Sequence, residues 1–293
     1  MLFRSVTAFT KAAIDAGYSG PLSLEIFNDE FRSAPARANA VDAKRSLLWL
    51  EEQVRHARAD SAPVCKVPLF DPPAPPSFSG WSFVEFAADP AAAARLEEWL
   101  IRIGFVRMGR HKSKNVLLMG QGEVRIVLNL EEDSAARTHF DLHGVSACAM
   151  AVAAPDTSAA FTRAEALLFP RASGRLGQDE LTIPSVRAPD GSLVYFCDAP
   201  VDGHHPFESD FVMDKAAWTT MDASIRIDHV VQAVPGGQVD PWVLFYRAVL
   251  SLQARRNIVL HDPYGVIRSR EMESTDGRMR VSVTNSERDR KST

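Results

Sequence analysis

The sequence has few cysteines, no long apolar run and no excess of basic residues. Its three cysteines, Cys65, Cys148 and Cys197, are widely spaced and form no CxxC pair, which argues against a disulfide framework or a zinc ribbon. No apolar run approaches the ~20 residues of a membrane-spanning helix. The first ten residues lack the apolar core and cleavage site of a signal peptide. We therefore expect a cytoplasmic protein with reduced thiols, Cys148 and Cys197 being small core residues.

The balance of charged residues indicates which classes of binding partner are not expected. Lysine and arginine number 33 and aspartate and glutamate 37, which gives a formal net charge of −4. A nucleic-acid-binding protein needs a basic face, so neither a nucleic-acid nor a membrane partner is expected. With 293 residues, 46% of them hydrophobic, the chain can form one large or two modest domains.

Proline gathers in one stretch, SAPVCKVPLFDPPAPPSFSG at residues 61–80, which predicts an extended linker. In front of it we expect a helix in residues 5–20, a short strand PLSLEIF at residues 21–27 and an amphipathic helix at residues 36–56. This is one step of a parallel α/β fold. A single step buries too little surface to fold alone, so the first ~60 residues are expected to be loosely attached.

Behind the linker, one pattern occurs three times: a strand, a helix, and alternating strands around a tight turn. The pairs Asp190-Gly191 and Asp276-Gly277 favour hairpin turns, because few residue types accept a positive φ there. With a further strand directly after each helix, the repeated unit is βαβββ. The opening strands are WSFVEFAA, VSACAMAVAA and IRIDHVVQAV, and the helices that follow are PAAAARLEEWLIRIGF, DTSAAFTRAEALLF and VDPWVLFYRAVLSL.

Three such units resemble the vicinal-oxygen-chelate fold and, in particular, the 4-hydroxyphenylpyruvate dioxygenase family. A complete member has four units, so the resemblance implies that the fourth is absent from this sequence. An apolar sheet face or edge of the third unit would then be open, and self-association is expected. The resemblance is carried by FVEF (residues 83–86), His143-Gly144, IDHVV (227–231), WVLFY (242–246) and GVIRS (265–269).

The front of the chain resembles a second family, the TIM-barrel sugar-phosphate isomerases. GPLSLEIFND looks like the last strand of that barrel, and Glu25 falls where the family has its final metal-ligating glutamate. Bacterial 3-dehydroshikimate dehydratases of one type join such a barrel to a dioxygenase-like region through a proline-rich linker. The implied fold class is α+β, with a barrel remnant at residues 1–60, a linker at 61–78, a first pair of units at 79–216 and an incomplete third unit at 217–293.

The two resemblances imply two unrelated metal sites. In the dioxygenases two histidines and one carboxylate hold Fe(II), and the resemblance places one histidine at His229. In the barrel family Glu25 would help to hold Mg, Mn or Co, which polarises a substrate carbonyl and eases proton removal and loss of water. The plainer alternatives are a metal-free His229 and a solvated carboxylate at Glu25. Ser282 and Thr284 depart from the dioxygenase pattern at positions that line the substrate cavity there.

Three functions follow from these readings. The first is a fragment of a metal-dependent 3-dehydroshikimate dehydratase, which forms protocatechuate in aromatic catabolism. The second is an Fe(II) dioxygenase that acts on a 4-hydroxyphenylpyruvate-like keto acid. The third is a non-catalytic remnant or association module. The partner in the first two is a small-molecule substrate, and the chain alone is expected to be inactive and to bind no metal tightly.

Overall fold

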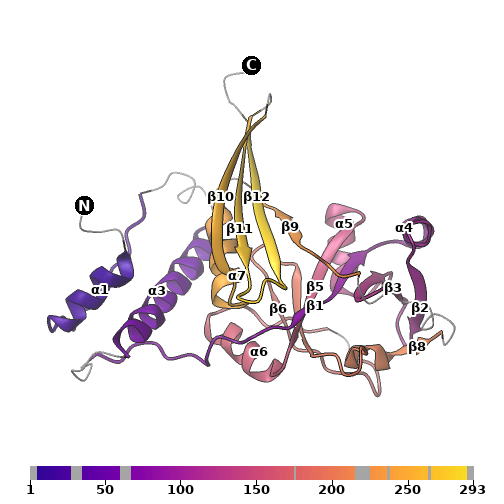
Figure 1. The fold of residues 1–293 in the computed structure, drawn as a ribbon, viewed down its shortest axis with the longest axis horizontal. Helices are drawn as coiled ribbons and strands as arrows, with labels where there is room; N and C mark the ends of the chain where they lie inside the picture. The colour runs from indigo at the N-terminus through magenta and orange to yellow at the C-terminus, as the bar shows by residue number, and fades with distance from the viewer. Residues whose placement is uncertain are drawn as a thin grey trace.

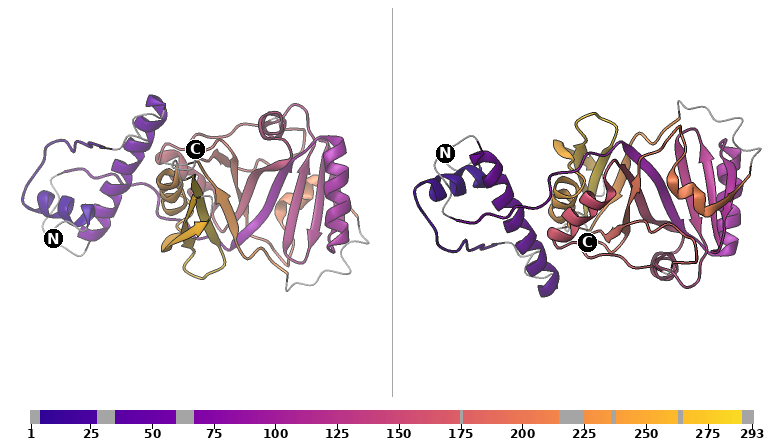
Figure 2. Two further views of the ribbon diagram at one scale, coloured as in Figure 1. Left: turned by 90° about the horizontal axis from the view of Figure 1, so that it is seen from above. Right: turned by 90° about the horizontal axis from the view of Figure 1, so that it is seen from below.

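A computed structural model describes residues 5–27, 35–59, 67–174, 176–214, 225–235, 238–262 and 265–288 of the chain. The front helices α1 (Val6–Asp15) and α3 (Ala36–Arg58) lie to one side of a body built from two sheets (Figures 1 and 2). The Ser5 hydroxyl begins α1 by accepting a hydrogen bond from the Ala8 N–H. An ion pair between Asp15 and Arg58 joins the two helices.

The strand predicted at residues 21–27 is absent. These residues are exposed coil, and no strand in the described part of the chain pairs with them. A strand depends on hydrogen bonds to a neighbouring strand, so an apolar alternating sequence alone does not produce one. That prediction was wrong.

The first unit has the predicted βαβββ order. It comprises β1 (Gly80–Ala87), α4 (Pro90–Arg102), β2 (Val106–His111), β3 (Val116–Gln121) and β4 (Val124–Asn129). Asp89 caps α4 through a 2.7 Å hydrogen bond from the Ala92 N–H, and Pro90 takes the first helical position, where its missing N–H costs nothing.

The second unit departs from this order in one place. Helix α5 (Ala135–His143) connects the first unit to it, and the second unit comprises β5 (Ser146–Ala154), α6 (Thr157–Ala166), β6 (Ser185–Arg187) and β7 (Leu193–Asp198). The strand expected directly after α6 is reduced to a single bridge between Arg171 and Val186. Gly191 has φ +88°, as the predicted Asp-Gly turn requires. A 3₁₀ helix η1 (Pro206–Asp210) and β8 (Phe211–Met213) then lead back to β2.

The first two units share one eight-stranded sheet with the order β6-β7-β5-β1-β4-β3-β2-β8. The two opening strands, β1 and β5, are antiparallel neighbours within it. Each opening strand has a parallel neighbour on its other side, β4 beside β1 and β7 beside β5. The sheet is therefore two similar halves joined at β1 and β5.

The third unit forms a separate sheet. It comprises β9 (Val230–Ala233), α7 (Val239–Ala248), β10 (Gln253–Asp262), β11 (Gly265–Glu273) and β12 (Arg280–Arg288). The strand order is β10-β11-β12-β9, with β9 parallel to β12 at one edge. Gly277 in the Asp-Gly turn between β11 and β12 has φ +71°. The repeated units and the predicted α+β class are confirmed.

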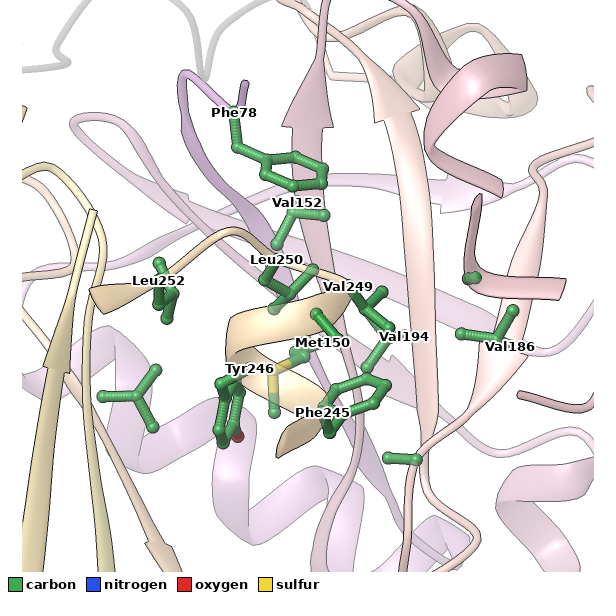
Figure 3. Close-up of a cluster of buried hydrophobic side chains, with 14 of the residues drawn as sticks. Phe78, Met150, Val152, Val186, Val194, Phe245, Tyr246, Val249, Leu250 and Leu252 are labelled. Atoms are coloured by element: carbon green, nitrogen blue, oxygen red, sulfur yellow. The ribbon is translucent and has the colours of Figure 1, made fainter. Parts of the chain in front are cut away.

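Helix α7 packs the third unit against the second. Its aromatic residues Trp242, Phe245 and Tyr246 are at most 1% exposed. They share one apolar core with strands β5 and β7, as Figure 3 shows for Phe245 beside Val194. Phe78, just ahead of β1, belongs to the same core. None of the helices in the described ranges is long and apolar enough to cross a membrane.

A buried arginine attaches the front of the chain to this core. Arg163 of α6 forms a bidentate pair with Glu52 of α3, at 2.8 and 2.9 Å, and both side chains are 0% exposed. The same guanidinium donates 2.7 Å hydrogen bonds to the carbonyls of Pro73 and Ala248. Helix α3 and the linker at Pro73 are thus docked. The expectation that the whole front piece is loosely attached was wrong for α3.

We expect Glu52→Ala to destabilise the chain by about 3–5 kcal/mol, because it leaves the Arg163 charge buried without its partner. Urea unfolding followed by circular dichroism measures this change. Glu98→Ala is the matched control, since Glu98 pairs with Arg102 on the surface with 64% of its side chain exposed, and it should leave the midpoint unchanged. Equal effects of the two substitutions would contradict this account of α3.

Candidate functional site

His229, the predicted iron ligand, lies at the edge of the four-stranded sheet. It directly precedes β9, rather than lying within that strand, and 55% of its side chain is exposed. Its Nδ1 is 2.9 Å from an Asp228 carboxylate oxygen. When Nδ1 carries the proton and donates it to Asp228, Nε2 keeps the lone pair that a metal ligand needs. The side chain is therefore held and oriented by its neighbour.

The Asp228 carboxylate starts a chain of charged contacts across the sheet. Arg280 of β12 donates to Asp228 at 3.2 Å and lies 3.5 Å from Glu273 of β11. Glu273 in turn accepts a 3.1 Å hydrogen bond from Arg255 of β10. The hydrogen bond from His229 and the charge of Arg280 hold the pKa of Asp228 below its ordinary value. Asp228 is thus ionised at neutral pH and available to orient His229.

The first and third units can be superposed strand by strand from their hydrogen bonds. In the first unit β1 pairs with β4 over Val84–Ala87, and in the third β9 pairs with β12 over Val230–Ala233. In each unit the next backbone N–H continues the ladder, from Ala88 to Asn129 at 3.1 Å and from Val234 to Thr284 at 2.8 Å. His229 therefore corresponds to Phe83.

The first and third units differ in the side chains on the sheet face that contains Phe83 or His229. In the first unit Phe83 packs with Val116, Leu118 and Val127 in a closed apolar cluster. The strand pairing gives the equivalent positions in the third unit. Val116 corresponds to Ser269, Leu118 to Glu271 and Val127 to Ser282. The hydroxyls of Ser269 and Thr284 are 2.8 Å apart, and those of Ser282 and Thr284 are 3.3 Å apart. The third unit thus offers a polar, hydroxyl-bearing face beside His229.

Glu25, the predicted barrel ligand, lies on the exposed coil of residues 21–27. No group of three or more His, Cys, Asp or Glu side chains that could hold a metal ion occurs among the residues that the structure describes. Within those ranges, neither Glu25 nor His229 is therefore part of an assembled metal site. The residues in the described ranges do not by themselves fit a metal of either kind.

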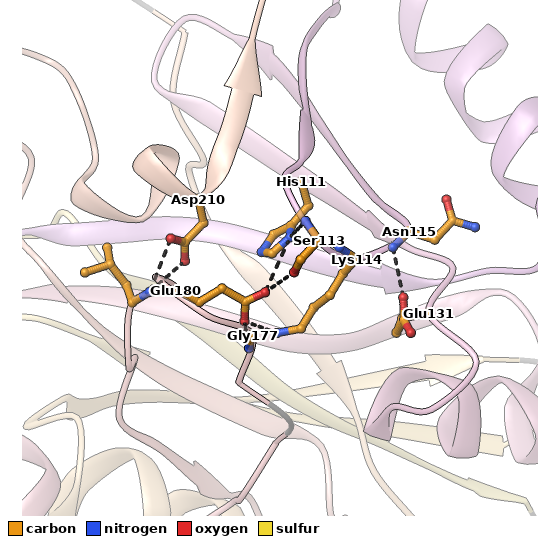
Figure 4. A network of polar contacts seen from close by, with 9 residues as sticks. His111, Ser113, Lys114, Asn115, Glu131, Gly177, Glu180 and Asp210 are labelled. Carbon is orange, nitrogen blue, oxygen red and sulfur yellow. Dashed lines mark hydrogen bonds and ion pairs between the residues drawn. The ribbon is translucent and has the colours of Figure 1, made fainter.

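A polar network that the sequence analysis did not identify ties the β2–β3 turn to the loop before β6 (Figure 4). The Glu180 carboxylate accepts hydrogen bonds from Lys114 at 2.7 Å, from the Gly177 N–H at 2.7 Å and from the Ser113 hydroxyl. The His111 Nδ1 accepts the Ser113 and Lys114 N–H groups, each at 3.2 Å. Because His111 Nδ1 accepts and faces no serine hydroxyl, the group is not a nucleophilic triad. It holds the two loops together.

Burial alone would raise the pKa of Glu180, but the hydrogen bonds from Lys114, Ser113 and Gly177 outweigh it and lower the pKa to about 2. Burial lowers the pKa of His111, which keeps the imidazole neutral as its acceptor position requires. The side chains that bind Glu180, those of Lys114 and Ser113, lie 66 and 67 residues away along the chain. No local sequence pattern identifies such a contact.

A second buried carboxylate, Glu85, lies on β1. Its Oε1 accepts a 2.7 Å hydrogen bond from Asn129 and lies 3.8 Å from the Cys148 sulfur. Burial raises the pKa of Glu85 and that of Cys148, and it raises the pKa of Cys197 to about 12. Both cysteines are buried free thiols, as the sequence analysis predicted. Raised pKa values make them poor nucleophiles and metal ligands.

Comparison with known proteins identifies the repeated region. Residues 72–212 match the family described as hydroxyphenylpyruvate dioxygenase, N-terminal. This match covers the first two units. The 4-hydroxyphenylpyruvate dioxygenase of Legionella pneumophila is 27% identical to the chain over 219 residues, which cover 73% of this chain and 60% of that relative. A 4-hydroxymandelate synthase variant from Streptomyces coelicolor, 17% identical with a TM-score of 0.59, shares the fold over 73% of this chain and 64% of its own.

Relatives of two further kinds match nearly the whole chain. The 3-dehydroshikimate dehydratases of Pseudomonas putida and Pseudomonas aeruginosa are each 44% identical over 283 residues, or 96% of this chain and 44% of the relative. A solved xylose isomerase-like TIM barrel/4-hydroxyphenylpyruvate dioxygenase fusion protein is 40% identical, with a TM-score of 0.83 over 97% of this chain and 45% of its own. The predicted resemblance to the fused dehydratases is confirmed. The chain spans less than half of their length.

The depressed pKa of Glu180 predicts a pH-dependent contribution to stability. Its folded-state pKa of about 2 lies below the ordinary 4.5, so the contribution is full above pH 4.5 and is lost as the pH falls towards 2. We expect Glu180→Gln to be less stable than the parent at pH 6 and to approach it at pH 2–3. Urea midpoints at both pH values test this, with the exposed Glu132→Gln as control. A difference that stays constant with pH would contradict it.

Proposed function

We propose that the chain is part of a metal-dependent 3-dehydroshikimate dehydratase, which converts 3-dehydroshikimate to protocatechuate and carries a dioxygenase-like region. The observation that carries this proposal is the 44% identity over 96% of the chain. A match of that extent includes the front helices as well as the three units. The proposed organisation keeps residues 1–60 as the barrel part, 61–78 as the linker, 79–216 as the first pair of units and 217–293 as the third.

Glu25 is the proposed ligand for Mg, Mn or Co in the dehydratase reaction. Its exposure on a coil that leads towards α3 leaves the carboxylate accessible to partner ligands. A bound divalent metal would polarise the substrate carbonyl. The described residues supply one such ligand, and affinity for a divalent ion comes from several ligands held in geometry. We therefore expect the 293-residue chain alone to bind metal weakly.

His229 is the proposed ligand for Fe(II) at a second site on the dioxygenase-like region. Three observations support it: the hydrogen bond that orients its ring, the solvent exposure of the side chain and the polar face beside it. The hydroxyls of Ser282 and Thr284 are the proposed substrate-contacting groups on that face. They favour a ligand with oxygen atoms.

An Fe(II) dioxygenase acting on a 4-hydroxyphenylpyruvate-like keto acid is the second candidate function. It is favoured by the position of His229 but leaves the front helices unexplained, because the Legionella relative matches 73% of the chain. A non-catalytic association module is the third candidate, favoured by the position of β9 at an edge of its sheet within the described part of the chain. The proposed partners are a small-molecule substrate and a second copy of the chain. A cytoplasmic location follows as a proposal from these metabolic relatives.

A chimera tests the dehydratase proposal directly. Replacing the matching segment of the Pseudomonas putida dehydratase with this chain should preserve protocatechuate formation, because the segments are homologous throughout. Glu25→Ala in the chimera should reduce kcat/KM by at least ~100-fold, as expected when a metal ligand is lost. The appearance of the aromatic product is followed by its absorbance.

Two matched variants make the outcome specific. Ser23→Ala, in the same exposed coil, should leave dehydratase activity unchanged. His229→Ala should also leave it unchanged, because His229 belongs to the other site. Loss of protocatechuate formation in His229→Ala but not in Glu25→Ala would contradict the assignment and favour the dioxygenase.

The isolated chain provides a complementary test. We expect it to form no protocatechuate from 3-dehydroshikimate with added Mg, Mn or Co, and to consume no oxygen with 4-hydroxyphenylpyruvate and Fe(II). The physical reason is the absence of three assembled ligands in the described ranges. Turnover abolished by Glu25→Ala would show instead that a barrel site assembles, and turnover abolished by His229→Ala would show that an iron site does.

A further inference from the structure

The C-terminal end of α6 has a backbone conformation that is unusual for its residue. The Leu168 N–H donates to the Glu165 carbonyl at 2.9 Å, and the Phe169 N–H donates to the Ala164 carbonyl at 3.0 Å, which is a Schellman turn. Leu168 has φ +62°, at a position that glycine usually occupies. Since 42% of Leu168 is exposed, burial of its own side chain does not hold it in this conformation.

A side chain from the front of the chain binds this turn. Arg45 of α3 donates a 3.2 Å hydrogen bond from Nε to the Leu167 carbonyl and a second one from Nη2 to the Leu168 carbonyl. Its guanidinium carbon also lies 4.0 Å from the centre of the Phe169 ring. A cation is favoured both at the C-terminal end of a helix and over an aromatic face. The turn thus presents two carbonyls and a ring to one guanidinium.

Further contacts fix α3 along its length. The guanidinium of Arg247, on α7, lies 5.6 Å from the Trp49 ring centre. Glu52 forms the buried pair with Arg163 of α6. These contacts extend from Arg45 to Glu52, about two helical turns, so they fix both the position and the rotation of α3. Among them, Arg45 lies nearest to the start of the helix.

The coil that carries Glu25 lies between α1 and α3 in the sequence. On its C-terminal side the chain leads to the start of α3. On its N-terminal side α1 is joined to α3 by the ion pair between Asp15 and Arg58. A displacement of α3 therefore moves both helices that flank the coil. The position of Glu25 depends in this way on the contacts that dock α3.

We propose that the dioxygenase-like region positions the front of the chain for the dehydratase reaction, and that Arg45 is a positioning residue for that reaction. This role rests on the proposed dehydratase function and is separate from the proposed site at His229. Arg45 acts through the α6 turn, which holds the first half of α3. A displacement of about 1 Å at a reacting group, caused far from the chemistry, can reduce a rate by about 100-fold.

Hydrogen exchange on the 293-residue chain tests the contact itself. Arg45→Met removes both hydrogen bonds and the charge over Phe169 while keeping a good helix former. Amides in the first half of α3 should then exchange at least ~10-fold faster, through a local opening that leaves β5 protected. Lys44→Met is the matched control, because Lys44 is the exposed neighbour of Arg45. It should exchange like the parent.

Dehydratase kinetics test the positioning role. In the chimera with the Pseudomonas putida dehydratase, Arg45→Met should reduce kcat by about 10–100-fold. The KM for 3-dehydroshikimate should change little, because Arg45 binds α6 rather than substrate. Lys44→Met should retain the kcat of the parent chimera. A purely structural role would instead lower the amount of folded enzyme and leave the kcat of the folded fraction unchanged.

The two arms separate this role from the proposed function. A parent chimera that forms no protocatechuate would contradict the dehydratase function, and the positioning role would fall with it. An active chimera with equal kcat in Arg45→Met and Lys44→Met would overturn the positioning role and leave the dehydratase function standing. Equal exchange of α3 in the two variants would also overturn it.

Discussion

The buried guanidinium of Arg163 is the contact on which the rest of the structure depends. It binds the Glu52 carboxylate of α3 and the carbonyls of Pro73 and Ala248, so four segments of the chain meet at one side chain. These segments are the front of the chain, the linker, the second unit and the third unit. A buried charge requires its partners in place, which fixes these segments relative to one another. Helix α3, in the part of the chain that resembles a barrel end, is thereby packed against the repeated units.

The repeated unit produces two different surfaces from one topology. In the first unit the face that contains Phe83 is closed by apolar packing, and η1 contributes Phe207 to it. In the third unit the equivalent face carries Ser269, Thr284 and the exposed His229. This difference is consistent with the proposed binding role of the third unit. The two halves of the dioxygenase-like region thus differ in the polarity of this face.

Much of this organisation could be predicted from the sequence because its signals are local. Alternating strands, amphipathic helices and the turns at Gly191 and Gly277 depend on residues close together in the chain. The features that the sequence did not predict depend on residues far apart in the chain. The apolar alternation of PLSLEIF could not show that no strand in the described part of the chain pairs with it. Glu52 and Arg163 are 111 residues apart, and each is a charged residue in a helix, where the sequence gives no sign of burial. The candidate site divides similarly, since the resemblance predicts His229 as a ligand but gives no sign of the contact of Asp228 with His229 or with Arg280.

Native-state hydrogen exchange of α3 tests the central claim most directly, namely that the front helix and the repeated units form one cooperative body. Amides around Glu52 should exchange with the same free energy and the same denaturant dependence as those of β5, because both require global unfolding. Helix α1, which packs against α3 at the outside, should exchange faster. Exchange of α3 together with α1, through a local opening that leaves β5 protected, would contradict the account.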